Sequence, residues 1–279
     1  MGALSFILAL APILWLVAIL MIFKWPAWKA AVGSFATSAA LAFAWWHLPV
    51  MEVATASLEG FLMALWPIVL VIIAAVFTYN LCVETGAMDV IGHMITSISS
   101  DRRILSLLVA WCFGGFMEGM AGFGTAVAIP AGMLAGLGFS PVPTVLMCLL
   151  ANGVPTPYGS IGIPTVSLAG LTGLDPIHLG TVQLLQLAPF YLAAPFLIVL
   201  VAGAATGETQ APGAAARLRG VAGIALASGV SFLAPAIAVA AFVGPELTMV
   251  VGSICSLGVT AFLGSRAERS GHLDGAFRM

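Results

Sequence analysis

Residues 113–125 read Phe-Gly-Gly-Phe-Met-Glu-Gly-Met-Ala-Gly-Phe-Gly-Thr, and this stretch decides the fold. Five glycines occupy the eleven positions from Gly114 to Gly124, and each costs about 1 kcal/mol relative to alanine inside a helix. In lipid, a broken backbone is tolerated only inside the protein or beside a water-filled cavity. We therefore expect two half-helices or a helical hairpin between Phe113 and Gly138.

The composition around this stretch indicates that lipid is the main solvent of the chain. The 279 residues are 61% hydrophobic and 7% charged, with a mean hydropathy of +1.14. Soluble domains carry roughly 25% charged residues, so a soluble fold could not cover its own surface here. No basic tract indicates a nucleic acid, and the four isolated cysteines read as packing residues. The predicted fold class is all-α, a polytopic transmembrane helix bundle with broken or re-entrant helices.

Apolar runs approaching the roughly 20 residues that a span needs recur along the chain. The first run lacks a basic segment before it and a cleavage site after it, so we read it as a retained span. Together the runs predict a transmembrane helical domain over residues 1–264 and a polar cytoplasmic tail over 265–279, which we expect to fray. The predicted spans are Ala3–Phe23, Ala30–His47, Phe61–Cys82, Ile104–Phe116, Pro143–Ala151 extended to Pro157, Thr181–Gly203, Gly220–Val243 and Leu247–Leu263.

The basic residues between the spans can all lie on one side of the membrane, which we assign as cytoplasmic by the positive-inside rule. This places the N-terminus outside and the C-terminus inside. It also requires an odd number of crossings between Arg103 and His178, which either one span plus a re-entrant hairpin or three spans would satisfy. The basic residues are Lys24, Lys29, Arg102, Arg103, Arg217, Arg219, Arg266 and Arg269.

Two stretches between the spans have distinct compositions. Residues Glu84–Ser100 mix acids, His93, Ser and Thr with apolar side chains, and predict an interfacial amphipathic helix. Residues Ala204–Ala216 are rich in Gly, Pro, Glu and Gln, and predict a solvent loop.

Glu118 is the acid within the glycine-rich stretch. A carboxylate at membrane depth is costly to ionise, and one that gains and loses a proton can carry it together with a substrate. The second half-helix, beginning at Gly124 and Thr125, would offer free N–H groups and a positive dipole to an anion. The alternative is a helix-end acid near the interface that backbone N–H groups satisfy, with Gly115 and Gly119 serving close helix packing.

A second candidate site is Ala-Asn-Gly-Val-Pro-Thr-Pro-Tyr-Gly-Ser at 151–160, where two prolines unwind the helix. Its carbonyls and polar side chains could coordinate a solute, or it could be an ordinary loop ending a span. Ala128–Leu137 also resembles Gly162–Leu171 at a constant offset, by chance or as a local repeat. With Glu118 as the proton carrier, the predicted substrate-binding residues are Gly122, Gly124, Thr125, Asn152, Thr156 and Ser160.

The remaining polar residues suggest no other chemistry. Glu84 marks the interface, and Asp101-Arg102-Arg103 reads as a helix start with topology-setting cations. Gln183 and Gln186 could line a cavity or bond between helices. His47, His93 and His178 have no metal-ligand spacing, so we expect neither a metal nor a cofactor. No HExxH, GxSxG or Walker motif is present, so we do not expect an enzyme.

A series of collinear blocks runs from Thr78 to Leu247. The block Glu118-Gly119 followed by Ala121-Gly122-Phe123-Gly124-Thr125 is specific, and the others are weak individually. The others are Thr78-Tyr79-Asn80-Leu81, Val83-Glu84-Thr85-Gly86, Asp101-Arg102-Arg103, Cys112-Phe113-Gly114, Leu137-Gly138-Phe139, Leu150-Ala151-Asn152, Gly162-Ile163-Pro164, Thr172-Gly173-Leu174-Asp175 and Gly244-Pro245-Glu246-Leu247. On these blocks the chain resembles the L-lactate permease family.

The resemblance implies a multi-pass secondary carrier that moves lactate, glycolate or related 2-hydroxy monocarboxylates with protons across the bacterial inner membrane. It covers the N-terminal half of the family, so the chain is expected to be one repeat-like half that pairs with a second half or forms a homodimer. The alternative is an accessory half that is inactive alone, and sodium coupling also stays open. The sequence departs from the family at Ala126, where Pro is usual, at Gly153-Val154, and at Leu185, where a basic residue is expected.

Overall fold

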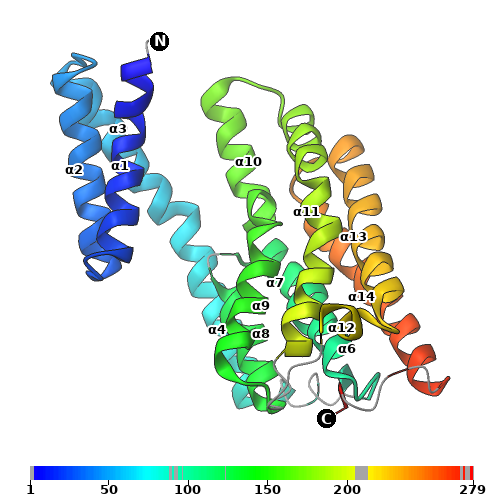
Figure 1. Ribbon diagram of the computed structural model, residues 1–279. Coiled ribbons are helices and arrows are strands. Elements are labelled where there is room, and N and C mark those ends of the chain that lie inside the picture. Colours follow the sequence, from blue (N-terminus) through cyan, green and yellow to red (C-terminus); the bar gives the residue numbers. More distant parts are fainter. Residues whose placement is uncertain are drawn as a thin grey trace. The chain divides into compact units, whose positions relative to one another are not determined.

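The computed structural model describes residues 3–87, 90, 94–95, 97–122, 124–204, 213–270, 273 and 277–278, and the chain divides into two compact units, Met1–Leu70 and Val71–Met279. Helices make up nearly all of the described residues, which confirms the predicted all-α class (Figure 1). Five described helices are long and apolar enough to cross a membrane. They are Leu4–Met21, Arg102–Met120, Pro176–Ala204, Ala222–Phe242 and Thr248–Arg269.

In the first unit, two helices pack side by side because a glycine lets them approach closely. The Trp15 ring of α1 lies where a Cβ on Gly33 of α2 would stand, and the Ser34 hydroxyl donates to the Pro12 carbonyl at 3.0 Å. The next helix bends at Trp66, which has non-helical φ and ψ because Pro67 follows it. The elements are α1 (Ala3–Met21), α2 (Ala27–Ala44), α3 (Val50–Met63) and η1 (Ala64–Val69), followed by α4 (Leu70–Glu84).

The second unit is built around one central helix, which runs without interruption from α6 through η2 to α7. The residues from Ile104 to Cys112 are fully buried, and α11, α13 and α14 pack around them. The elements are α6 (Arg102–Ser106), η2 (Leu107–Phe113, a π-helical turn), α7 (Gly114–Met120), α8 (Thr125–Gly136), α9 (Pro141–Gly153), η3 (Thr156–Tyr158), α10 (Gly159–Thr172), α11 (Pro176–Ala204), α12 (Ala214–Leu218), α13 (Ala222–Phe242) and α14 (Thr248–Arg269).

Helices α7 and α8 form the predicted hairpin. The chain turns after Met120, and α8 returns along the central helix, so that Gly114 faces the Ala126 carbonyl and the Pro130 ring. The guanidinium of Arg102, at the start of α6, lies 5.3 Å from the ring of Phe139, which follows α8. The hairpin therefore enters and leaves at the same end of the unit.

Helices α9 and α10 follow one another with a break between them, after which α11 returns (Figure 1). One hairpin and one broken pair of helices thus connect Arg103 to His178. The number of membrane crossings in this region stays a prediction. The two segments of the predicted echo fall on α8 and α10, each of which follows a break.

The end of the chain differs from the prediction of a frayed tail. Helix α14 continues through Ser265 to Arg269, and Leu273 and Phe277 are buried. Helix α12 likewise begins at Ala214, inside the predicted loop Ala204–Ala216, of which residues 205–212 lie outside the described residues. Residues 88–89, 91–93 and 96 of the predicted amphipathic helix, His93 among them, also lie outside them.

Candidate functional site

The first backbone break lies between α7 and α8. Gly122 and Gly124 have φ of +58° and +89°, which only glycine adopts easily. A Cβ on Gly122 would also collide with the Ser160 hydroxyl. The Thr125 side chain and its N–H both donate to the Gly122 carbonyl, at 2.6 and 3.0 Å, so these two donors are used within the turn.

The other three glycines of this stretch have a different role from the one predicted. Gly114, Gly115 and Gly119 lie inside the continuous α7, not at the break. A Cβ on Gly115 would stand 2.7 Å from the Phe232 ring, and one on Gly119 would stand 2.9 Å from Met249 Cβ. Close packing against α13 and α14 therefore explains Gly115 and Gly119, as the alternative reading held.

The second break separates α9 from the body of α10, as its two prolines predict. Ser160, Ile161 and Gly162 all adopt left-handed conformations, with φ of 50°, 58° and 72°. This conformation costs roughly 1–2 kcal/mol for a residue with a side chain, and more for the β-branched Ile161. Backbone strain of this kind is concentrated at ligand-binding and switching sites.

The two breaks meet at Glu118. The Ser160 hydroxyl donates to the Ala121 carbonyl at 2.6 Å, which joins the second break to the first. A Cβ on Gly159 would collide with Glu118 Oε1, so the glycine makes room for the acid. The structure therefore brings together three of the predicted site residues, namely Glu118, Gly122 and Ser160.

Glu118 is 3% exposed, and its Oε2 has no hydrogen-bond donor within the described part of the chain. The reading in which backbone N–H groups satisfy a helix-end acid is therefore not what the structure shows. The other buried side-chain atoms left without a partner among the described residues are Asn152 Oδ1 and Trp111 Nε1. Buried polar groups are nearly always hydrogen-bonded, so unpaired ones at a break indicate a proton or a ligand.

The remaining predicted side chains take different positions. Asn152 lies near the end of α9, which packs against α7, and its amide oxygen is buried. The exposed Thr156 donates to the carbonyl of Asn152 at 2.8 Å within its own turn. Open space adjoins Gly124. The Asn152 amide oxygen thus has no partner among the described residues and Gly124 adjoins open space, whereas the hydroxyls of Thr125 and Thr156 are committed to local bonds.

Sequence reasoning did not identify Tyr158 and Gly159, although both lie in the predicted second segment. The buried Tyr158 hydroxyl donates to the Gly180 carbonyl of α11, and thereby fixes the break against that helix. Thr165 Oγ1 lies 2.8 Å from Gln183 Oε1, so Gln183 bonds between helices, one of the two alternatives left open. No pattern in the sequence distinguished these residues from ordinary loop and span positions.

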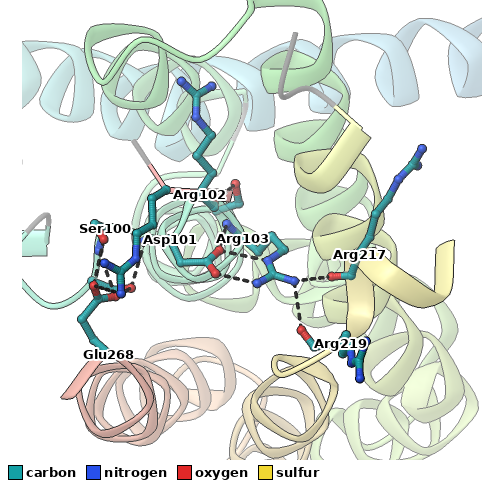
Figure 2. A network of polar contacts seen from close by, with 10 residues as sticks. Ser100, Asp101, Arg102, Arg103, Arg217, Arg219 and Glu268 are labelled. Atoms are coloured by element: carbon teal, nitrogen blue, oxygen red, sulfur yellow. Dashed lines mark hydrogen bonds and ion pairs between the residues drawn. The ribbon is translucent and has the colours of Figure 1, made fainter. Parts of the chain in front are cut away.

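A second polar centre that the sequence did not reveal lies at the foot of the central helix (Figure 2). Asp101 and Arg103 form an ion pair of 2.6 Å, and both side chains are completely buried. Arg103 also donates to the carbonyls of Arg217 and Arg219, at 2.8 and 3.1 Å, and lies 3.9 Å from the Phe277 ring. We call Asp101, Arg103 and these partners the foot network.

Nearby, the Glu268 carboxylate accepts hydrogen bonds from the hydroxyls of Ser99 and Ser100, each at 2.8 Å. Arg102 and Arg103 at the start of α6, Arg217 and Arg219 before α13, and Glu268 at the end of α14 therefore lie at one end of this unit (Figure 2). The bonds of Glu268 and the contact of Phe277 with Arg103 tie the described C-terminal residues to this end.

Five long apolar helices among the described residues, joined by a hairpin and a broken pair of helices, define a multi-pass helical membrane protein. The model of the L-lactate permease family matches residues 5–268, and the chain belongs to that family. The family is one of permeases and not of enzymes.

Several curated relatives match almost the whole chain. An L-lactate permease from Streptococcus iniae is 43% identical over 94% of this chain and 54% of its own length. An L-lactate permease from Escherichia coli K12 is 35% identical, and glycolate permease GlcA from the same strain is 33% identical, each over 91% of this chain and 44% of the relative. The chain thus spans about half the length of these relatives. No solved structure matches it.

Proposed function

We propose that this chain is a carrier half that moves lactate, glycolate or a related 2-hydroxy monocarboxylate together with a proton across the bacterial inner membrane. The observation that carries this proposal is the crossing of two backbone breaks around Glu118, whose buried Oε2 has no donor among the described residues. Membership of the L-lactate permease family, and similarity to lactate and glycolate permeases, support the substrate class.

In this proposal Glu118 binds the coupled proton. Burying a charged carboxylate without a hydrogen-bond donor costs much more free energy than burying a neutral carboxylic acid. Glu118 therefore binds a proton when the site is closed to water. The substrate carboxylate would lie beside Gly122 and Gly124 at the start of α8, where the helix dipole favours an anion. Asn152 would accept the substrate hydroxyl, because its amide oxygen is buried without a donor in the described part of the structure. Ser160 would hold the two breaks together, and Thr125 and Thr156 would shape the tips.

The test is uptake of labelled lactate into liposomes that contain the chain, with and without an inward proton gradient. We expect the gradient to accelerate uptake, and Glu118→Gln to abolish that acceleration. Glu59→Gln, which changes an exposed acid on α3, is the matched control and should behave as the unmodified chain does. Gradient-driven uptake that Glu118→Gln leaves unchanged would refute the proton role.

A second candidate is that the chain is an accessory half, inactive until a different chain binds it as the partner half. The observation that favours it is the coverage of only 54% and 44% of the relatives' lengths. Light scattering after size exclusion in detergent distinguishes the two. A monomer without uptake favours this second candidate, and a dimer with uptake favours the first.

A further inference from the structure

Tyr191 on α11 has a hydroxyl that is bound weakly for its depth in the protein. The side chain is fully buried, and its hydroxyl donates to the thioether sulfur of Met249 at 3.1 Å. Thioethers are weak acceptors, so this bond is exchanged at little cost. The ring itself is held by Trp111 and Phe232, whose centroids lie 6.0 and 5.4 Å from it. The O–H group therefore has a fixed position and an exchangeable partner.

Met249 links this hydroxyl to the helix that carries Glu118. Its sulfur accepts the Tyr191 hydroxyl, and its Cβ lies against Gly119, the residue that follows Glu118 on α7. Glu118 Oε2 is a strong acceptor that is buried without a donor among the described residues. The Tyr191 hydroxyl, a donor bonded to a weak acceptor, is therefore connected through one side chain to the residue beside this acid.

We propose that the Tyr191 hydroxyl is a reserve donor, which leaves Met249 and binds the Glu118 carboxylate once Glu118 has released its proton. This inference rests on the proposed function. Hydrogen bonds to a charged group are stronger than those to a neutral one, so the exchange favours ionised Glu118 and leaves protonated Glu118 almost unaffected. Tyr191 is then a positioning residue that acts through Glu118.

Few other titratable groups face this pair. Helices α8 and α10, which pack against α7, carry none. Tyr158 is committed to the Gly180 carbonyl. On the other elements packed against α7, the groups are Cys112 on η2, Cys148 on α9, and Cys255, Arg266, Glu268 and Arg269 on α14, the last three in its final turn at the foot.

The experiment follows the carboxylic acid band of Glu118 by infrared difference spectroscopy as pH is varied, with the full chain in lipid. Glu118→Gln assigns the band. We expect Tyr191→Phe to move the midpoint of its titration to higher pH by about one unit, a tenfold change in the protonation equilibrium, because the ionised form loses its donor. Tyr158→Phe is the matched control, since its hydroxyl has a strong partner, and its midpoint should stay in place.

A second variant keeps the Tyr191 hydroxyl and removes the sulfur that accepts its hydrogen bond. Met249→Leu removes the thioether, so the midpoint should move to lower pH. A midpoint that neither variant moves, or one that Tyr158→Phe moves as far as Tyr191→Phe, overturns the inference. The infrared band is measured without transport. If the midpoint shifts in the variants but the chain takes up no lactate, the inference holds and the proposed function fails. If a proton gradient drives uptake but the midpoint does not shift in either variant, the proposed function holds and the inference fails.

Discussion

Two acids are buried among the described residues of the second unit, Asp101 at the N-cap of the central helix and Glu118 within it, and their surroundings are opposite. Asp101, at the foot, is completely buried and pairs with Arg103, which in turn binds two carbonyls and the Phe277 ring. Glu118, at the crossing, is almost as buried, yet no described residue donates to its Oε2. A carboxylate thus stabilises the fold where its hydrogen bonds are complete, as at Asp101. Where they are not, as at Glu118, it can exchange a proton or a bonding partner. Burial alone does not separate the two cases, whereas hydrogen bonding does.

The largest effect should come from breaking the foot network. Arg103→Met leaves Asp101 buried without its cation, which we expect to destabilise the chain by about 3–5 kcal/mol. Thermal unfolding in detergent measures the loss. Arg102→Met, at a neighbouring residue with only a ring contact to Phe139, should cost far less. Equal losses in the two variants would mean that the foot network has no special role.

The next effect should come from closing the space beside Glu118. Gly159→Ala places a Cβ against Glu118 Oε1, and overpacking of this kind costs typically 1–3 kcal/mol. In Glu118→Ala the collision is absent, so the double variant should recover most of the loss. Gly153→Ala is the control, because a Cβ there meets open space. Additive losses in the double variant would show that the glycine and the acid are not in contact.

A smaller and opposite effect is expected at the strained turn. Ile161→Gly removes the left-handed strain of a β-branched residue and should exceed Ile161→Ala in stability by about 1 kcal/mol. The two variants compared in the same detergent give the difference directly. If the alanine variant is the more stable one, the left-handed turn is not a source of strain.

The smallest effect is expected from Glu118→Gln. The acid forms no described hydrogen bond that the amide would lose, so the unfolding free energy should change by less than about 1 kcal/mol. A loss as large as that of Arg103→Met would place Glu118 with Asp101 among the structural acids, and would remove the contrast between the two sites.

The sequence predicted which segments form the site, but not which atoms within them are in contact. The dense glycines and the paired prolines predicted both breaks, because these residues change backbone energetics wherever they occur. They could not show which glycines serve packing, because Gly115 and Gly122 are indistinguishable in the sequence. Only the fold shows that Gly115 lies against Phe232 and Gly122 against Ser160. Asp101 and Arg103 read as a helix start, which is correct for Asp101, but their burial depends on carbonyls more than a hundred residues away.

Composition and local pattern by themselves determined that this chain lies in lipid, that it is helical, where its helices break and which family it resembles. These properties follow from transfer free energies and backbone propensities, which each residue carries with it. The tertiary structure decided that the two breaks cross at Glu118, that the acid at the foot is fully paired, and that Tyr191 bonds to Met249, which packs against the residue after Glu118. Such pairings depend on how distant segments meet in space, which no local property of the chain specifies.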